Sequence, residues 1–587
     1  MDNLQTDREK AKEITDHLAI LRLIRQPYEA QIDEVIKYVN HSRRKIIDKD
    51  INKGLKTGID VYDGTAISAA NILTDGLCGY TATPSLIWYK YTLPGKLNFP
   101  RTSGMRGWSG KRMDEYPEVR EWLTDCEDVT WSAFLRSNFY DVIPEFIKDG
   151  VSIGTSTMLI EEDLKKDRIV FTCPHFREGY FAEDRYGVVD TYFRVYKISL
   201  RDLIDKFTIE RMSKIFLDLT NMLKRNPFEE REVLHATFPR RDISPYRIDN
   251  KNMPVASYWI IMDKKNEILG EDGYEELPSV TWRWRKNNDE ICGRSPSWDA
   301  YIEIMKGNQQ GKTNLIAGHK AVDGPMVAVE SMRGKIFKEA GATTFVQNME
   351  REKPEPLLTN MQLPYGIDQQ DRTDKIIREF FYVDFFLMLN RAAFEKVELT
   401  ATQTIGMQAE QATVLSIRTG RLGSEAYNPT HDRVFAIEDR NRRIPMPPDL
   451  LQEQILLLSR KGRKTKIEID YVGPLAQVQK RLVKYQAIRA GLEFLGSMQQ
   501  IAPESMDEVN ISQIIREGLD SISFPANCLN SDEQRDKIRQ VRQQKREMEE
   551  SIQAAGEIGK VVQRTSKEVQ PGSPMEMIMG GGGGVKE

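Results

Sequence analysis

The segment GNQQGKT, residues 307–313, contains residue types that could bind a phosphate group. A phosphate-binding loop of the Walker type has four residues between its first glycine and its Gly-Lys pair. It also follows a buried strand, so that its backbone amides curl round the phosphate. Here only Asn308, Gln309 and Gln310 separate the glycines, and the preceding residues WDAYIEIMK continue a helical pattern. The segment is therefore predicted to be a polar helix face with two small residues, and not a nucleotide site.

A second motif, GVSIG at residues 150–154, matches the G-x-S-x-G elbow that exposes a nucleophilic serine, here Ser152. That elbow needs a strand before it and a helix after it. The order is reversed in this chain, because the helical pattern DVIPEFIKD precedes the motif and strand-like TSTMLIEE follows it. The prediction is a glycine-rich turn from a helix into a strand.

The histidines and cysteines are not spaced for metal binding. They are His17, His41, His175, His235, His319, His431, Cys78, Cys126, Cys173, Cys292 and Cys528. No His-x3-His or Cys-x2-Cys spacing supports a zinc site, and the neighbouring pair in CPHF is predicted to be a strand edge. The sequence thus predicts no catalytic residue, no metal and no cofactor, so the protein is predicted not to be an enzyme.

Four basic residues lie in one predicted helix, residues 301–321: Lys306, Lys312, His319 and Lys320. Lysine on a helix usually marks a solvated face. If the helix instead lined a channel, these side chains would lie near phosphates and would each add a weak, salt-screened attraction. The sequence leaves both interpretations open, because it does not say which face these residues occupy.

The composition, with 40% hydrophobic and 29% charged residues, is that of an ordinary soluble globular protein. The 587 residues exceed the roughly 250–300 at which a single core stops growing, so two or more structural regions are expected. The 84 basic and 88 acidic residues leave a formal charge of −4. Near-neutrality argues against a protein that coats nucleic acid, but not against one that surrounds DNA without gripping it.

The odd number of scattered cysteines indicates a reducing compartment. The first residues, MDNLQTDREKAKEITDH, are charged and contain no apolar core of a signal peptide. We therefore expect the protein to be made and to work in a cytoplasm, or in something assembled there.

Up to about residue 290 the patterns predict a mixture of helices and strands. Apolar residues at helical spacing predict a helix over 18–40, which Pro27 is expected to kink or break. A second helix is predicted over 65–79, followed by a strand in PSLIWYKY. From Trp131 to Met158 a helical pattern gives way to strand-like runs. We predict an α+β fold that is mainly helical.

The segment 376–394 is predicted to form one long helix, because neither Gly nor Pro occurs between Asp371 and Ile405. It is apolar round most of its circumference. It is not a membrane span, since charged residues interrupt any run approaching the roughly 20 apolar residues that a bilayer needs.

Such an apolar helix must be covered by its own domain or by neighbouring copies of the chain, as in a ring of subunits. Phe381, Phe385 and Met388 are the candidate subunit-interface residues on it. Further helices are predicted over 404–442, over 475–495 and, in polar form, over 531–550. The tail, which ends in the five glycines 580–584, is predicted to be disordered.

Several separated blocks resemble the head-to-tail connecting (portal) proteins of short-tailed, T7-like bacteriophages. They are YDGTAISAANILTDGLCGYTATPSLIWYKY, DGVSIGTSTMLIEE, WRWRKNNDEICGRSPSWDA with AVDGPM, LTATQTIGMQAEQATVLSIRTGRLGSEAYNPTHDR and IEIDYVGPLAQVQK. The matching order of five blocks makes the resemblance specific, although each block alone is weak. The chain departs from the family pattern at Gly64, Cys292, Gly324, Gln403 and Met407.

The resemblance implies a ring, usually of twelve subunits, at one vertex of the capsid in the virion, assembled in the host cytoplasm. Such a ring nucleates shell assembly with the major capsid protein, docks the terminase motor and later binds a tail adaptor. Double-stranded DNA passes through its axial channel, and no membrane is involved. ATP hydrolysis would belong to the motor and not to this chain.

The resemblance also implies a division of the chain. Residues 1–295 would be an α+β wing, 296–322 a first stem helix, 323–370 a clip and 371–396 a second stem helix. A channel loop would occupy 397–403, next to Lys396 as a further channel candidate. A wing helix and returning segment would follow over 404–474, then a helical crown over 475–550 and a flexible tail over 551–587.

Two other functions stay open from the sequence. A capsid-internal scaffold or assembly protein would share the polar helical C-terminal region, but would not explain the apolar segment 376–394. A nucleic-acid-processing ATPase subunit would need a true phosphate loop at GNQQGKT.

Overall fold

A computed structural model gives the architecture of the chain. It describes residues 2–43, 60–95, 112–207, 212, 215–216, 219–244, 249–263, 265–322, 325–337, 343–346, 348, 350–351, 354–356, 363–387, 420–452, 455, 467–471, 491, 514–515, 535, 537–545 and 547–548. The chain divides into two compact units, Met1–Leu482 and Val483–Glu587. Nearly all of the described structure belongs to the first unit.

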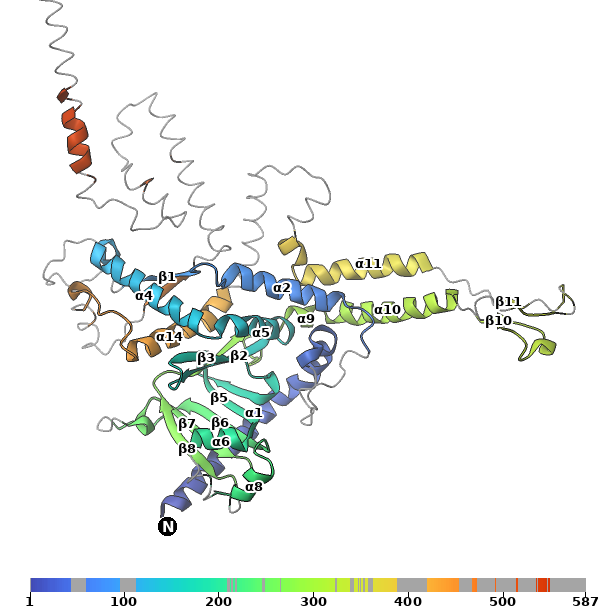
Figure 1. Cartoon of the computed structure of the whole chain (residues 1–587), viewed down its shortest axis with the longest axis horizontal. Helices are drawn as coiled ribbons and strands as arrows, with labels where there is room; N and C mark the ends of the chain where they lie inside the picture. Colours follow the sequence, from blue (N-terminus) through green and yellow to red (C-terminus); the bar gives the residue numbers. More distant parts are fainter. Residues whose placement is uncertain are drawn as a thin grey trace, which may run out of the picture. The chain divides into compact units, whose positions relative to one another are not determined.

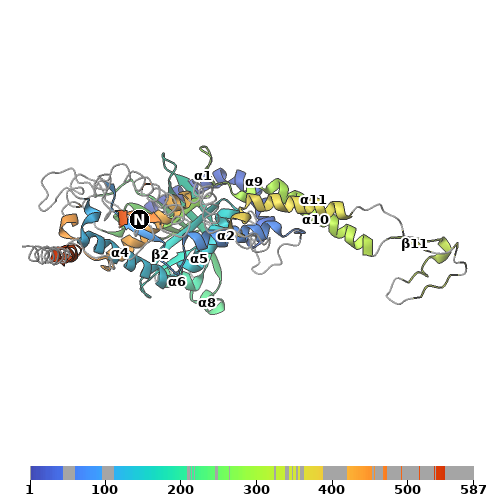
Figure 2. The ribbon, with the colours of Figure 1, turned by 90° about the horizontal axis from the view of Figure 1, so that it is seen from above.

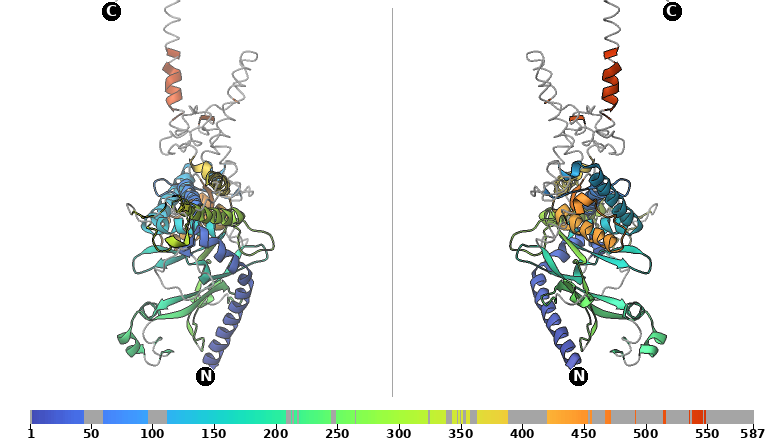
Figure 3. Two further views of the ribbon diagram at one scale, coloured as in Figure 1. Left: turned by 90° about the vertical axis from the view of Figure 1, so that its right-hand side faces the viewer. Right: turned by 90° about the vertical axis from the view of Figure 1, so that its left-hand side faces the viewer.

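The largest sheet is an antiparallel meander of five strands in chain order. The strands are β4 (Gly179–Glu183), β5 (Val189–Ser199), β6 (Glu230–Pro239), β7 (Val255–Ile261) and β8 (Ile268–Tyr274). Helix α1 (Asp2–Val39) packs its apolar residues on one face, and α6 (Leu200–Phe207) and α8 (Leu219–Arg225) cover the other (Figures 1 and 3). Both faces of this sheet are therefore buried.

The prediction that Pro27 could break the first helix is wrong, because α1 continues through Pro27. The helix also begins sixteen residues earlier than expected. Long-range contacts hold the helix just before the proline. Arg25 Nη1 donates to the carbonyl oxygens of Phe176, Arg177 and Gly179 at 2.9, 3.0 and 2.6 Å. Its guanidinium also lies 3.8 Å from the centre of the Tyr180 ring. These contacts offset the cost of roughly 3 kcal/mol that proline brings to a helix interior.

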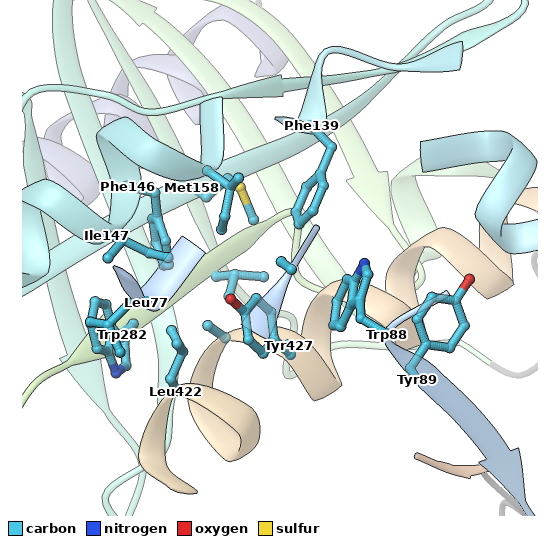
Figure 4. Close-up of a cluster of buried hydrophobic side chains, with 14 of the residues drawn as sticks. Leu77, Trp88, Tyr89, Phe139, Phe146, Ile147, Met158, Trp282, Leu422 and Tyr427 are labelled. Carbon is cyan, nitrogen blue, oxygen red and sulfur yellow. The ribbon is translucent and has the colours of Figure 1, made fainter. Parts of the chain in front are cut away.

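A second, three-stranded sheet has the order β3 (Arg168–Thr172), β2 (Thr155–Asp163), β9 (Ser279–Arg283). It packs with α2 (Thr65–Thr81), α4 (Pro117–Arg136) and α5 (Phe139–Ser152) around the main hydrophobic core. Figure 4 shows Leu77, Phe146 and Trp282 in this core, although they come from α2, α5 and β9.

The core continues into a pair of strands that are distant in sequence. Strand β1 (Tyr89–Thr92) pairs with β12 (Glu468–Tyr471), and Trp88 stacks on Tyr471 with ring centres 6.1 Å apart. Beside them lies α14 (Asn428–Arg440), which follows a π-helical turn, η6 (Gly423–Tyr427). The helix predicted over 404–442 is confirmed for residues 420–440, and 404–419 lie outside the described residues.

Short 3-10 helices occur between these elements. They are η1 (His41–Arg43), η2 (Met113–Glu115), η3 (Phe176–Glu178), η4 (Asn250–Asn252) and η5 (Glu330–Met332).

The predicted α+β fold is confirmed, since helices and antiparallel sheets share one core.

Two further helices lie side by side: α10 (Tyr301–Val322), entered through α9 (Pro296–Asp299), and α11 (Leu363–Phe380) (Figures 1 and 2). Between them in sequence, β10 (Met326–Val327) pairs with β11 (Glu355–Pro356). The helix predicted over 301–321 is confirmed almost to the residue.

The prediction of one long helix over 376–394 is wrong in its described part. Helix α11 begins at Leu363, inside the range expected for the clip, and ends at Phe380. Tyr382 then takes a positive φ of 55°, and residues 383–387 form a new helical turn. We attribute this break to packing. Phe381 is fully buried in the core, and the Phe386 ring packs directly on Gly76 of α2, in space that a larger residue at that position would occupy. Residues 388–394 lie outside the described residues.

A buried ionic cluster joins three of these segments. Arg283, at the end of β9 and with a side chain only 2% exposed, pairs with Glu183 of β4 and with Glu425 of η6. Lys286 Nζ lies 2.6 Å from Glu183, and Arg421 Nη2 lies 2.7 Å from Glu425. Each of these partly buried carboxylates therefore has two cationic partners.

In the second unit, residues 537–545 are helical and exposed, which confirms that part of the predicted polar helix. The predicted amphipathic helix over 475–495 falls outside the described residues except for Gly491, and the predicted tail lies outside them altogether.

Candidate functional site

Small residues let α10 and α11 approach each other and the start of α2. A side chain at Gly307 would place its Cβ 2.7 Å from Asp63 Oδ2 and 3.5 Å from atoms of both Thr373 and Ile377. A Cβ at Gly311 would lie 2.9 Å from the carbonyl oxygen of Tyr62. The two glycines of GNQQGKT therefore serve close packing inside a continuous helix. This confirms the prediction that the segment is helical and not a phosphate loop.

The chain before α2 is bonded to the same side of α10. The Tyr62 amide donates to Asn308 Oδ1 at 2.7 Å, and Asn308 Nδ2 donates to the Asp60 carbonyl at 3.2 Å. Lys312 Nζ lies 5.5 Å from the centre of the Tyr62 ring. These contacts fix residues 60–62 on α10.

Asp63 stabilises the first turn of α2, because its Oδ1 accepts from the amide and hydroxyl of Thr65 at 2.9 and 2.7 Å. Asp374 of α11 interacts with the same pair. Burial, followed by the negative charge of Asp63, raises the pKa of the Asp374 carboxyl, while a hydrogen bond with Thr65 acts in the opposite direction. The sequence block that begins with YDGTA at Tyr62, the first of the five that resemble portal proteins, thus contains the residues through which α2 contacts the helix pair.

Two glycines of α10, Gly311 and Gly318, give a direct test of this packing. Gly318, also in α10, has open space where a Cβ would stand. Gly318→Ala should stabilise the chain by about 0.5–1 kcal/mol through helix propensity. Gly311→Ala should lack this gain and be less stable than Gly318→Ala by about 1–3 kcal/mol, because its Cβ would press on the Tyr62 carbonyl.

Urea unfolding of the two variants side by side measures the difference, with the wild-type chain as the reference. Equal stability of the two variants would contradict the close approach at Gly311.

All four described basic candidates lie on the exposed side of α10. Lys306, Lys312, His319 and Lys320 are exposed, whereas Ile304, Gly307 and Gly311 are buried. Lys306 pairs with Glu303 at 3.1 Å across one helical turn, and such exposed pairs contribute little to stability. Lys396 lies outside the described residues.

Phe381, predicted to be a subunit-interface residue, is corrected to a core residue. It has no exposed surface in the single chain, so it offers nothing to a neighbouring copy. Phe385 is half-buried, with its ring centre 6.1 Å from Tyr80 and 4.7 Å from Phe386, and as an interface residue it stays a prediction. Met388 lies outside the described residues.

Sequence reasoning missed two sets of exposed apolar residues on the helix pair, which are interrupted by polar side chains and are named the α10 stripe and the α11 stripe. The α10 stripe consists of Ile302, Met305 and Ile316, which are 76%, 37% and 44% exposed. The α11 stripe consists of Tyr365, Ile376 and Phe380, which are 61%, 37% and 37% exposed. Their helical spacing was readable in the sequence, but only the structure shows that these residues face away from the core.

The other candidate chemistry proves to be structural. Ser152 is fully buried at the end of α5, where its hydroxyl donates to the Lys148 carbonyl at 2.7 Å. Gly154 follows with a φ of 97° and leads into β2, which confirms the predicted turn. His175 Nε2 lies 2.9 Å from the Arg43 carbonyl, and burial lowers the pKa of this imidazole to about 3.

No three His, Cys, Asp or Glu side chains among the described residues gather closely enough to hold a metal ion. None of the helices in the described part of the chain is long and apolar enough to cross a membrane.

Comparison with known proteins agrees with the resemblance seen in the sequence blocks. The family model described as bacteriophage head to tail connecting protein matches residues 11–529. The portal protein of Salmonella phage epsilon15 is 25% identical over 581 residues, which cover 97% of this chain and 97% of that protein. Neither finding favours the scaffold or the ATPase alternative. The chain belongs to the family of bacteriophage head-to-tail connecting proteins.

Proposed function

We propose that this chain is the portal subunit of a phage, and that about twelve copies form a ring at one capsid vertex. The observation that carries the ring is the pair of apolar stripes on α10 and α11. Gly307 of α10 contacts Thr373 and Ile377 of α11, so the buried sides of the two helices face each other. The α10 stripe lies opposite the buried side of α10, whereas the α11 stripe lies about 90° round from the buried side of α11. The two stripes therefore form different surfaces of the helix pair.

Two different apolar surfaces on one subunit are what a ring needs. A head-to-tail contact joins unlike surfaces of successive copies, and it closes into a ring when the rotation between copies divides a full turn. In this arrangement the α10 stripe of one copy packs on the α11 stripe of the next. Residues 296–322 and 363–380 then form the stem, and Phe385 extends the same contact.

The axial channel for double-stranded DNA is assigned to the stem because of its exposed basic residues. Lys306, Lys312, His319 and Lys320 form a thin set of positive charges on the exposed side of α10, which also carries the α10 stripe. They would therefore line the channel along the edge of the contact between copies. A channel through which DNA slides should attract phosphates weakly, and a near-neutral chain with few basic residues suits this role better than a basic clamp. Lys396 belongs to the same proposal.

The segment between α10 and α11 is proposed as the clip that docks the terminase motor and later the tail adaptor. Its β10–β11 pair is only two residues long, and Val327, Phe337 and Phe345 are 55%, 61% and 87% exposed. A strand pair this short is marginal alone and gains stability when other chains cover it.

The remaining regions keep their proposed places: the wing over 1–295 and 404–474, the channel loop over 397–403, the crown over 475–550 and the tail over 551–587. The ring would sit in the virion against the major capsid protein and be assembled in the host cytoplasm. No chemistry of its own is proposed for the chain.

End-on electron microscopy of the purified protein tests the ring. We expect closed rings with a central hole wide enough for duplex DNA. Ile316→Asp should raise the protein concentration needed for half-assembly at least about tenfold, because burying one such side chain contributes about 1.5–3 kcal/mol.

Leu315→Asp is the matched control, since Leu315 is 51% exposed and points about 100° away from Ile316 on the same helix. Equal losses from both variants would contradict the stripe assignment while leaving the ring intact. Monomers or open aggregates of the wild-type chain would contradict the ring itself.

A further inference from the structure

Helix α1 has an apolar outer side as well as an apolar inner one. Between residues 19 and 31, the exposed residues are Ala19, Ile20, Leu23, Ile24, Gln26, Pro27, Ala30 and Gln31, and none is charged. Five of them, Ile20, Leu23, Ile24, Pro27 and Ala30, follow one another at helical spacing and are named the α1 stripe. Leu23 is 68% exposed and Ile20 is 55% exposed.

The charged residues of the same segment contact the body of the subunit. The Arg22 guanidinium lies 5.7 Å from the centre of the Tyr180 ring. Arg25 is only 6% exposed, and its Nε donates to Glu29 at 2.7 Å. This arrangement is the reverse of an ordinary surface helix, which turns its charges to water. A contiguous exposed apolar stripe of this kind marks a contact surface.

The α1 stripe ends beside the α10 stripe. About one turn beyond Ala30 lies the exposed residue Glu34, whose Oε2 accepts a hydrogen bond from the Tyr301 hydroxyl at 2.8 Å. Tyr301 directly precedes Ile302, the first residue of the α10 stripe. Leu23 and Glu34 are separated by about 16 Å along the helix axis. The α1 stripe therefore leads to the first turn of α10, where the α10 stripe begins.

We propose that the α1 stripe packs against the next copy of this chain in the ring, as an extension of the α10 contact. The proposal rests on the proposed ring. A second copy is the occupant because a neighbour seated on the α10 stripe meets the α1 stripe beyond Glu34. An uncharged apolar surface also suits a permanent contact between copies, since permanent interfaces are more apolar than transient ones.

Photo-crosslinking within assembled rings of the full chain tests this contact. p-Benzoylphenylalanine replaces Leu23, and labelled subunits (nitrogen-15) are co-assembled with unlabelled ones. After irradiation we expect covalent dimers whose crosslinked peptides pair a labelled with an unlabelled copy. The matched control places the same probe at Leu164, which is 80% exposed in the β2–β3 turn, and should give no such dimer.

An assembly assay adds a second readout. Leu23→Asp should raise the concentration for half-assembly at least about tenfold while the circular dichroism of the monomer stays unchanged, and Leu164→Asp should leave assembly unaltered.

Crosslinks within a single copy would contradict the α1 contact but not the ring. Crosslinks formed only with co-expressed capsid protein would do the same. Rings assembled at the wild-type concentration by Leu23→Asp would overturn the α1 contact as well. A wild-type chain that forms no ring would overturn the proposed function, and this contact with it.

Discussion

Replacing Arg283 by methionine should lower the free energy of unfolding of the first unit by about 3–5 kcal/mol. The guanidinium bridges Glu183 and Glu425, and its Nη2 also donates to the Gly187 carbonyl at 3.0 Å. Methionine keeps most of the side chain's volume but none of its donors. Two partly buried carboxylates then each lose one cationic partner, and the cost comes from those uncompensated charges.

The effect should spread beyond one strand, because the cluster ties together segments far apart in sequence. Glu183 belongs to β4 of the five-stranded sheet, Arg283 to β9 of the three-stranded sheet and Glu425 to η6 ahead of α14. Urea unfolding followed by tryptophan fluorescence measures the loss, since every tryptophan lies at or before Trp298.

Arg333→Met is the matched control. Arg333 pairs with Glu330 at 3.2 Å, but the two side chains are 85% and 84% exposed. Exposed pairs of this kind contribute about 0–1 kcal/mol, so this variant should unfold almost as the wild type does. If both variants lost the same amount, burial would not be the cause and the proposed role of Arg283 would be wrong.

Replacing His431 by phenylalanine should protect the chain against acid. Between pH 7 and pH 5, this variant should lose about 2 kcal/mol less stability than the wild type. His431 is buried, and its ring centre lies 4.1 Å from that of Tyr89 and 5.0 Å from that of Phe134. Burial lowers the pKa of its imidazole to about 3, from an ordinary value of 6.5.

The direction follows from where the proton binds. Below about pH 6.5 the unfolded chain takes up a proton at this histidine, whereas the folded chain stays neutral there until about pH 3. The stability contributed by the neutral ring is therefore complete above pH 6.5 and declines as the pH falls. Burial likewise lowers the pKa of His235, which stacks on Trp259 at 4.0 Å.

Two other carboxyl groups stabilise the folded chain as the pH falls, which opposes the effect of His431. The prediction is therefore stated as the difference in acid sensitivity between the variant and the wild type. Burial raises the pKa of Glu127 to about 7 and that of Asp149 to about 6, and both groups favour the folded chain as the pH falls. Neither is changed in the variant. Tyr91, whose hydroxyl lies 3.4 Å from His431 Nδ1, keeps its hydrogen bond to Thr130 at 3.1 Å.

Urea midpoints at pH 7 and pH 5 measure the difference, and His17→Phe on the exposed side of α1 is the control. We expect His17→Phe to follow the wild type. A His431→Phe variant as sensitive to acid as the wild type would show that this histidine is not protonated on unfolding.

Assembly would link these stability effects to function. If the α10 and α11 stripes are buried between copies, each ring contact adds to the stability of the folded chain by mass action. A subunit weakened at Arg283 should then be partly rescued by assembly, whereas one changed at Ile316 should fold normally and fail to assemble.

The sequence by itself determined the class of the fold, the bounds of α10, the turn from helix to strand at Gly154 and the family. Each of these depends on local chemistry or on the order of motifs along the chain. The spacing in GNQQGKT excluded a phosphate loop because that loop depends on a fixed number of residues and on a preceding strand. Gly154 marked the turn because glycine accepts the positive φ found there.

Only the tertiary structure decided which helices continue, where they break and which of their faces are covered. Pro27 stays inside α1 because Arg25 is anchored on carbonyls 151–154 residues further along the chain. Helix α11 ends at Phe380, without Gly or Pro, because Phe381 enters the core. The α1 stripe is apolar because Arg22 and Arg25 turn inward. Periodicity along a sequence shows that a face is apolar, but whether that face meets its own core or another copy depends on contacts between distant segments.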